Sequence, residues 1–245
     1  MTLYSVLTQF VFELLGTLVL VLMGDGVCAC CSLEKSKGKG GGWIVITFAW
    51  GFAVMCGVLL AGPYTGAHLN PAVSVGLAIA GLFEWALVPY YVVAQMLGGF
   101  LGAVLVWMLY RDHYNETPDE QTKLGTFCTI PAIRNYKQNF FCEMIATIVL
   151  VAIIVSFNDA GNKAGLANLG PIPVTFVIVA LGMSLGGTTG YAMNPARDLG
   201  PRLAHALCPM KQKGGSDWAY SWVPVAGPMA GGIVAGLLGI ALLSV

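Results

Sequence analysis

Long apolar segments without charges constrain the fold of this 245-residue chain more than any other feature. A helix needs about 20 mostly apolar residues to cross the hydrocarbon core of a bilayer. The charged residues gather between such segments, in stretches such as SLEKSKGKGGG and RDHYNETPDEQTK. Only 10% of the residues are charged and 57% are apolar, whereas soluble proteins have about 25% charged residues. We therefore predict an all-α membrane protein that crosses the bilayer several times.

Six segments are long enough to span the membrane, and two are too short. The six are roughly residues 6–27, 43–61, 86–110, 140–157, 171–185 with its flanks, and 222–245. The two short apolar runs follow Asn70 and Asn194, and each opens with Asn-Pro. Asn is a favoured N-cap, and Pro at the first helical position loses no needed hydrogen bond. A short helix at membrane depth must be buried or line a wet cavity, so we predict two re-entrant half-helices.

The second half of the chain repeats the first. TGAHLNPAVSVG (residues 65–76) matches TGYAMNPARDLG (residues 189–200), and ELLGTLVLV (13–21) matches EMIATIVLV (143–151). MLGGFLGAVL (96–105) resembles MAGGIVAGLL (229–238), in the same order. Because each repeat has three spans, the second must enter from the opposite face, which makes the repeats inverted. We predict one domain over residues 1–245, with repeats at about 1–112 and 138–245 and a connecting loop at 113–137.

Two opposed half-helices favour the passage of uncharged solutes. Each helix N-terminus carries roughly half a positive charge, so two of them facing one lumen disfavour cations. If the side-chain oxygens of Asn70 and Asn194 cap the helices, their NH₂ groups remain free to donate to a solute. The loops GAHL and GYAM before the caps are expected to be extended, which leaves their carbonyls to line a pore. The predicted pore residues are the turns Asn70, Pro71, Ala72 and Asn194, Pro195, Ala196, and the carbonyls of Gly66, Ala67, His68, Gly190 and Ala192.

The duplicated Asn-Pro-Ala turns within six spans resemble the aquaporin superfamily, the major intrinsic proteins, over essentially the whole chain. Asp198 after Arg197, and Pro224-Val225 in WVPVAGP, resemble the glycerol-conducting branch. The resemblance implies an aquaporin-like fold and a passive channel domain for glycerol, related small neutral solutes and water that excludes ions and protons. It also implies a multi-pass protein of the cell membrane and a homotetramer in the lipid bilayer.

The resemblance further implies a selectivity filter made of Trp50, Gly182, Tyr191 and Arg197. Arg197 would repel cations and donate to two solute oxygens, while Trp50 and Tyr191 form an aromatic wall. Gly182 takes the position where water-only channels carry His, which leaves room for a carbon backbone. Tyr191 departs from the Phe common in bacterial glycerol facilitators, and this leaves the range of solutes open.

Three acidic residues are expected to support the loops rather than to carry protons. Glu13 and Glu143 lie within spans, where an ionisable residue by default suggests function. Their symmetric placement favours hydrogen bonding to the two re-entrant loops, with His68 a possible partner of Glu13. Asp198 is assigned to the same supporting role.

Several other functions compete with a passive channel. An ion-coupled secondary transporter shares the inverted repeats, and a water-only aquaporin is the closest rival within the family. A membrane enzyme is the third alternative, and it is disfavoured because His68, His113 and His205 form no evident site with a nucleophile or metal partners. We therefore expect no catalytic residue, cofactor or metal, and we interpret the CACC cluster (residues 28–31) as small buried side chains. The formal net charge of +0 gives no indication of nucleic-acid binding.

The loop charges oppose the orientation that the resemblance implies. With both termini cytoplasmic, only Lys163 would lie in an inner loop, and this breaks the positive-inside rule. The sequence also leaves open gating and the physiological solute, with dihydroxyacetone, urea, lactic acid and hydrogen peroxide as alternatives to glycerol. The basic residues that would lie outside are Lys35, Lys37, Lys39, Arg111, Lys123, Arg134, Lys137, Arg202, Lys211 and Lys213.

Overall fold

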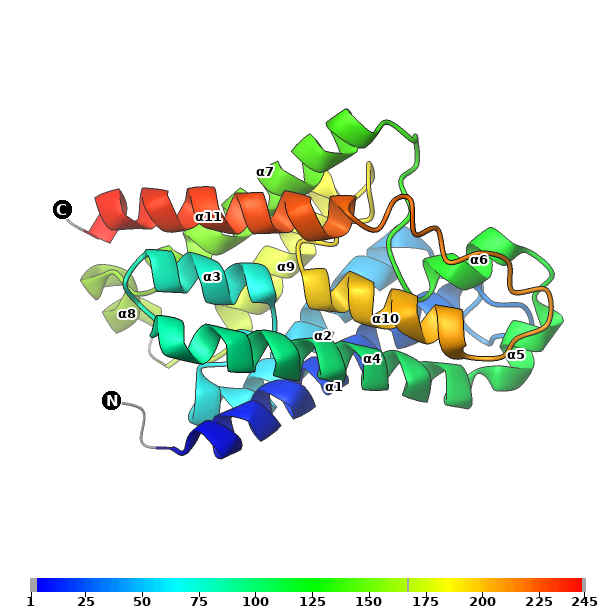
Figure 1. Cartoon of the computed structure of the whole chain (residues 1–245), viewed down its shortest axis with the longest axis horizontal. Helices are drawn as coiled ribbons and strands as arrows, with labels where there is room; N and C mark the ends of the chain where they lie inside the picture. Colours follow the sequence, from blue (N-terminus) through cyan, green and yellow to red (C-terminus); the bar gives the residue numbers. More distant parts are fainter. Residues whose placement is uncertain (1–3, 167, 244–245) are drawn as a thin grey trace.

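The computed structural model describes residues 4–166 and 168–243, and all regular secondary structure in these residues is helical. Long helices run roughly along the long axis of the molecule (Figure 1). They are α1 (Val6–Ser32), α2 (Gly42–Thr65), α4 (Val88–Leu109), α7 (Tyr136–Ser156), α9 (Ile172–Leu185) and α11 (Val223–Leu243). The half-helices are α3 (Pro71–Ile79) and α10 (Pro195–Leu207). Short helices lie in the connections: η1 (Trp85–Leu87), α5 (Arg111–Glu116), α6 (Glu120–Gly125) and α8 (Ala160–Leu166). The predicted fold class is confirmed.

The predicted spans differ in length. Five of the described helices are long and apolar enough to cross a bilayer by themselves. The exception is α9, whose 14 residues reach only about 21 Å, against a hydrocarbon core of about 30 Å. Turns at residues 168–171 and 186–189 continue the chain on both sides of it. This span therefore needs its flanks, as its sequence suggested.

Each half-helix packs on the last long helix of the other half of the chain. α10 lies along α4 and α3 lies along α11, while α1 packs on α2 and α4, and α7 packs on α11. Glycines allow this close approach. A Cβ at Gly99 would lie 2.4 Å from the Ala196 carbonyl oxygen, and one at Gly232 would lie 2.4 Å from that of Ala72. Any larger residue at these positions would push a half-helix out of place.

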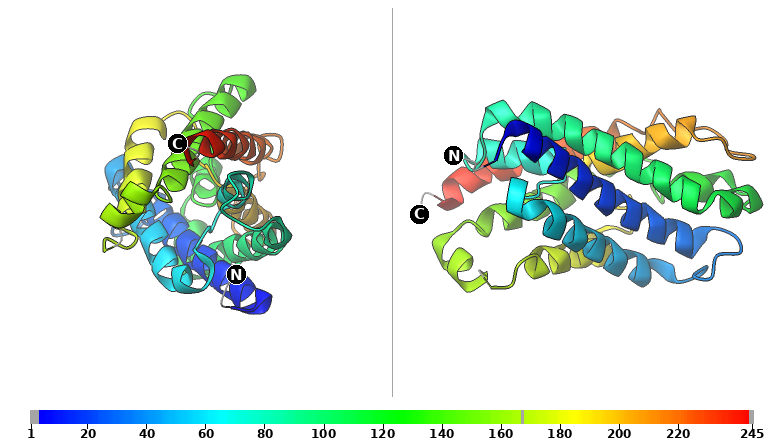
Figure 2. Two further views of the ribbon diagram at one scale, coloured as in Figure 1. Left: turned by 90° about the vertical axis from the view of Figure 1, so that its left-hand side faces the viewer. Right: turned by 90° about the horizontal axis from the view of Figure 1, so that it is seen from below.

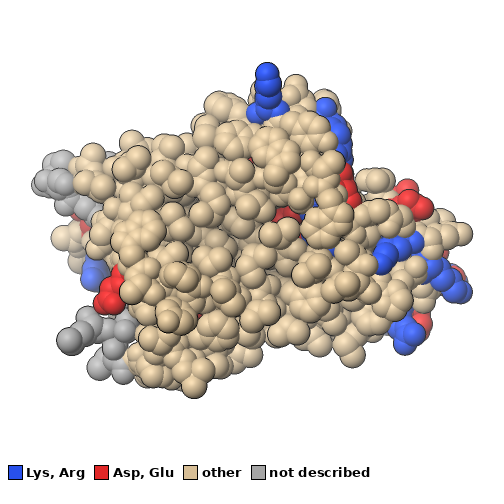
Figure 3. Space-filling model, in the orientation of Figure 1, with Lys and Arg blue, Asp and Glu red and all other residues tan. Residues whose placement is uncertain are grey.

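The two half-helices enter from opposite ends of the bundle. α3 and α10 follow one another along the long axis, with their N-terminal ends towards the middle of the molecule (Figure 1). The start of α1, the end of α11 and α8 lie at one end, which we call the terminal face, whereas α5 and α6 lie at the opposite end, the loop face (Figures 1 and 2). On the face that Figure 3 shows, most of the surface is uncharged, and Lys and Arg lie mainly along the upper edge and towards the loop face. This uneven distribution is the one that the loop charges predicted.

Candidate functional site

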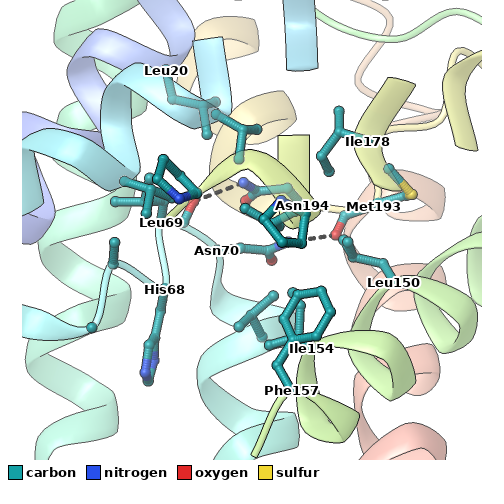
Figure 4. Close-up of a pocket in the computed structure, with 18 of the residues that line it drawn as sticks. Leu20, His68, Leu69, Asn70, Leu150, Ile154, Phe157, Ile178, Met193 and Asn194 are labelled. Atoms are coloured by element: carbon teal, nitrogen blue, oxygen red, sulfur yellow. Dashed lines mark hydrogen bonds between the residues drawn. The ribbon is translucent and has the colours of Figure 1, made fainter. Parts of the chain in front are cut away.

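The two Asn-Pro turns cap their helices and also tie the half-helices to each other. Asn70 Oδ1 accepts from the Ala72 N–H at 2.9 Å, and Asn194 Oδ1 accepts from the Ala196 N–H at 3.0 Å. Each side-chain Nδ2 donates across the centre, from Asn70 to the Met193 carbonyl and from Asn194 to the Leu69 carbonyl, both at 2.8 Å (Figure 4). An amide NH₂ carries two hydrogens. The prediction of free NH₂ groups is therefore only half right, because one hydrogen of each is used between the loops.

The prediction that the loops before the caps are extended is wrong. Ala67 and Leu69 have left-handed φ angles of 52° and 53°, and Tyr191 and Met193 have φ angles of 39° and 48°. Non-glycine residues adopt this region at a cost on the order of 1–3 kcal/mol each. In each loop, these left-handed residues alternate with a residue of another conformation, so the orientation of the peptide groups changes in a regular way along the loop. Such a backbone persists only where its surroundings hold it in place.

Two buried carboxylates hold these loops. Glu13 accepts from the backbone N–H groups of His68 and Leu69, both at 2.9 Å, and its Oε atoms also accept from Thr65 and Gln95. Glu143, which corresponds to Glu13 in the second repeat, accepts from the N–H groups of Ala192 at 3.0 Å and Met193 at 2.9 Å. The two acids thus make equivalent contacts with the two loops.

These contacts determine which way the loop carbonyls point. In a trans peptide, the C=O of one residue points opposite to the N–H of the next. Since the N–H groups of residues 68, 69, 192 and 193 point towards the carboxylates, the preceding carbonyls point away from them. Those carbonyls belong to Ala67, His68, Tyr191 and Ala192, which all line the central cavity. Tyr191 was absent from the predicted carbonyls. Of the two other predicted residues, Gly66 also lines the cavity, whereas Gly190 is not among the described residues that line it.

Two predicted partnerships differ in detail. The backbone of His68 contacts Glu13, whereas its ring Nδ1 lies 3.0 Å from Ser74 Oγ. Asp198 supports a different segment from the two glutamates. Its Oδ2 accepts from the N–H and the hydroxyl of Thr129 at 2.8 and 2.6 Å, and its Oδ1 pairs with Arg202 at 2.9 Å. Asp198 therefore anchors α10 to the loop-face connection rather than to the re-entrant loop.

A cavity of about 370 Å³ runs beside the half-helices. It reaches from Lys163 and Leu166, near the terminal face, past Asn70 and Asn194 to Arg197. Figure 4 shows its middle section, where apolar side chains from α1, α7 and α9 surround the two asparagines. The apolar wall includes Leu20, Val54, Val58, Leu150, Ile154, Phe157, Val174 and Ile178. One side of the cavity is therefore apolar, and the other offers carbonyls and amide N–H groups.

The cavity ends where three of the four predicted filter residues meet. The Arg197 guanidinium lies over the Trp50 ring, 4.0 Å from its centroid, and Tyr191 also lines this end. Within the described part of the chain, the Tyr191 hydroxyl and Arg197 Nη1 have no hydrogen-bond partner. Both atoms are buried in this conformation, so neither is exposed to the cavity.

Gly182, the fourth predicted filter residue, lies behind the ring of Tyr191. A Cβ at Gly182 would lie 2.7 Å from Tyr191 Cζ and 2.8 Å from Thr47 Cγ2. The space that the prediction left for a solute is therefore filled by the tyrosine ring. Trp43 borders the same ring edge-on, with centroids 5.8 Å apart, and its Nε1 donates to the Gly182 carbonyl at 2.9 Å. The missing side chain makes room for Tyr191.

Two residues of α1 at the filter were missed in the sequence analysis. A Cβ at Gly24 would lie 2.2 Å from Trp50 Cζ3, so the tryptophan ring is seated on this glycine. The neighbouring Asp25 is 1% exposed, and its Oδ1 lies 3.7 Å from Arg197 Nη1. The available signal was an ionisable residue inside a predicted span, which is the same signal that identified Glu13 and Glu143.

Comparisons with known proteins identify the family of this chain. The family model described as Major intrinsic protein matches residues 1–238. Glycerol uptake facilitator protein 3 of Lactiplantibacillus plantarum is 53% identical over 230 residues, which cover 94% of this chain and 95% of that protein. The probable glycerol uptake facilitator protein of Thermotoga maritima is 50% identical over 228 residues, which cover 93% and 96%.

A similar fold is found among solved structures. The X-ray structure of the aquaglyceroporin from Plasmodium falciparum aligns with a TM-score of 0.84 and 33% identity, covering 96% of this chain and 95% of that one. The resemblance seen in the duplicated Asn-Pro-Ala turns is thus confirmed over nearly the full length. This chain belongs to the major intrinsic protein family, and it is a multi-pass membrane protein of a channel family rather than an enzyme.

Proposed function

We propose that this protein is a passive channel through which glycerol and related small neutral solutes, with water, cross the cell membrane while ions and protons are excluded. The observation that carries the proposal is the two-sided cavity that ends at Arg197. The glycerol uptake facilitators of L. plantarum and T. maritima, at 53% and 50% identity, support the same solute class.

The two walls of the cavity suit a polyol. Glycerol has a carbon backbone that can lie against Leu20, Ile154 and Ile178, while its hydroxyls meet the loop carbonyls and the free amide hydrogens of Asn70 and Asn194. A neutral solute needs only a few such hydrogen bonds. An ion needs its entire hydration shell replaced, and a half-apolar wall cannot do this.

The filter adds a second selection step in this proposal. Arg197 donates to adjacent solute hydroxyls, and the rings of Trp50 and Tyr191 contact the CH groups. The positive ends of the α3 and α10 helix dipoles add to the barrier against cations. Gly182 contributes indirectly, through the position of the Tyr191 ring. Glu13, Glu143 and Asp198 keep the surrounding backbone in place.

The protein is also proposed to work in the bilayer as a homotetramer in which each protomer has its own pore. The outward faces of the long helices support the lipid contact, since they carry exposed large apolar residues along most of their length. Chemical crosslinking in membranes tests this assembly. A homotetramer should give a series of crosslinked species that ends at four protomers. Examples of the exposed residues are Leu7, Ile44, Val93, Leu109, Phe176 and Leu237.

Stopped-flow light scattering on proteoliposomes tests the function. We expect rapid re-swelling in glycerol, a low activation energy, and no change when an uncoupler removes the proton gradient. Glycerol flux that an uncoupler abolishes in intact vesicles would identify an ion-coupled carrier instead. Fast water flux without glycerol flux would identify a water-only aquaporin. A panel of dihydroxyacetone, urea, lactic acid and hydrogen peroxide then ranks the solutes.

A further inference from the structure

Asp25 lies buried in α1 directly behind the filter. Its Oδ1 is 3.7 Å from Arg197 Nη1, and its side chain is 1% exposed. Neither carboxylate oxygen has a hydrogen-bond partner among the described residues, and the same holds for Arg197 Nη1. A separation of 3.7 Å is close enough for an ion pair but too long for a hydrogen bond. Burying an unpaired charge is costly, so each of the two groups depends on the charge of the other.

Asp198, the second acidic residue near the filter, forms an ion pair with Arg202 rather than with Arg197. Asp198 Oδ1 lies 2.9 Å from Arg202 Nη2 and 3.0 Å from its Nε. The remaining donors of Arg202 reach the carbonyls of Thr129, Ser216 and Asp217. Within the described residues, Asp25 is therefore the counter-charge that is left for Arg197.

One face of α1 forms the rear of the filter. Trp50 packs over Gly24, and its Nε1 donates to Cys28 Sγ at 3.5 Å. The Arg197 guanidinium in turn lies 4.0 Å from the centroid of that Trp50 ring. Residues three and four apart share a helix face. Asp25, next to Gly24 and three residues before Cys28, thus attracts Arg197 towards the same surface on which Trp50 is seated.

We propose that Asp25 is a specificity-determining residue of the filter, which cancels the net charge of Arg197 and holds its guanidinium against Trp50. The inference rests on the proposed function and adds a selection rule to it. A guanidinium binds planar oxyanions through two parallel N–H groups, and the two half-helix ends are positive as well. Arg197 without a counter-charge would therefore attract small oxyanions. With Asp25 beside it, Arg197 donates to neutral hydroxyls and the filter stays closed to anions.

The variant Asp25→Asn removes this charge at nearly constant shape. Nitrate is the probe, because it is a planar oxyanion with no neutral form at neutral pH. Potential-driven nitrate uptake into proteoliposomes is expected to rise at least about tenfold over wild type, since one unit charge beside the path is lost. Asp25→Glu keeps the charge and is expected to restore anion exclusion. Glu116→Gln removes one exposed charge at the loop face, remote from the filter, and should leave nitrate uptake at the wild-type level.

Glycerol uptake is measured in the same vesicles. For Asp25→Asn it is expected to persist at a reduced rate, because Arg197 is no longer held against Trp50. Nitrate exclusion equal to wild type in an Asp25→Asn protein that still conducts glycerol would overturn the inference. A wild-type protein without glycerol flux would instead contradict the proposed function, so the two failures are distinct.

A double variant covers the case in which Asp25→Asn is not recovered from membranes. Asp25→Asn combined with Arg197→Gln removes both charges, so no unpaired charge remains buried at the filter. If the two residues compensate each other, the double variant is recovered in higher yield than Asp25→Asn alone. Equal loss of both proteins would show that Asp25 does not act through Arg197, and would refute the proposal.

Discussion

Gly182 lies under the ring of Tyr191, so the smallest possible substitution there should narrow the filter. The added Cβ of Gly182→Ala would lie 2.7 Å from Tyr191 Cζ and 2.8 Å from Thr47 Cγ2. Carbon atoms rest at about 3.5–4.0 Å from each other, so the ring must move by roughly 1 Å. Trp43 packs edge-on against the ring, and Thr47 crowds the added Cβ as well. The ring is therefore expected to move towards the cavity and Arg197.

The size of the effect follows from the strain. Overpacking a site by a methyl group costs typically about 1–3 kcal/mol. If about 1.4 kcal/mol of this appears in the barrier for glycerol, uptake falls about tenfold. Water is much smaller and should slow by about twofold or less, which corresponds to a few tenths of a kcal/mol. Gly182→His adds a whole ring at the same place and should lower the ratio of glycerol to water permeability further.

Stopped-flow measurement of both permeabilities in proteoliposomes, normalised to reconstituted protein, gives this ratio. Gly187→Ala is the matched control, because an added Cβ there meets no heavy atom within 4 Å. The control should behave as wild type. An unchanged ratio in correctly folded Gly182→Ala, or an equal fall in Gly187→Ala, would refute the link between Gly182, the Tyr191 ring and solute size.

Three further predictions concern the filter and the loops. Arg197→Ala leaves Asp25 unpaired at the filter, so a potassium leak should appear in vesicles held at a fixed membrane potential; unchanged selectivity would place Arg197 outside the constriction. Glu13→Gln and Glu143→Gln each weaken two hydrogen bonds to backbone N–H groups, and each should lower the free energy of unfolding by about 2–3 kcal/mol. Thermal unfolding in detergent checks this, and wild-type midpoints would mean that the loops need no support. Tyr191→Phe removes one hydroxyl and should change the ranking of polyols; a closed pore would contradict this.

The overall fold could be predicted because its signals are local. The length of an apolar run determines whether it can span a bilayer, and an Asn-Pro pair determines where a helix begins. α3 and α10 begin at Pro71 and Pro195, with Asn70 and Asn194 as their N-caps. The symmetric positions of Glu13 and Glu143 also pointed to equivalent contacts. The loop conformation could not be predicted, because left-handed non-glycine residues are held there by carboxylates from distant helices.

The sequence by itself thus determined the membrane class and the two capped half-helices, each from residues close together in the chain, and the inverted repeat, from the match between the two halves. Only the tertiary structure decided which groups meet at the filter. Asp198 follows Arg197 directly, yet it pairs with Arg202, because residues four apart share a helix face while adjacent ones do not. Asp25 reaches Arg197 only through the way helices from both halves of the chain assemble around the cavity. Gly182 looked like open space for a solute, but the backbone of Tyr191, with its φ of 39°, directs a ring into that space.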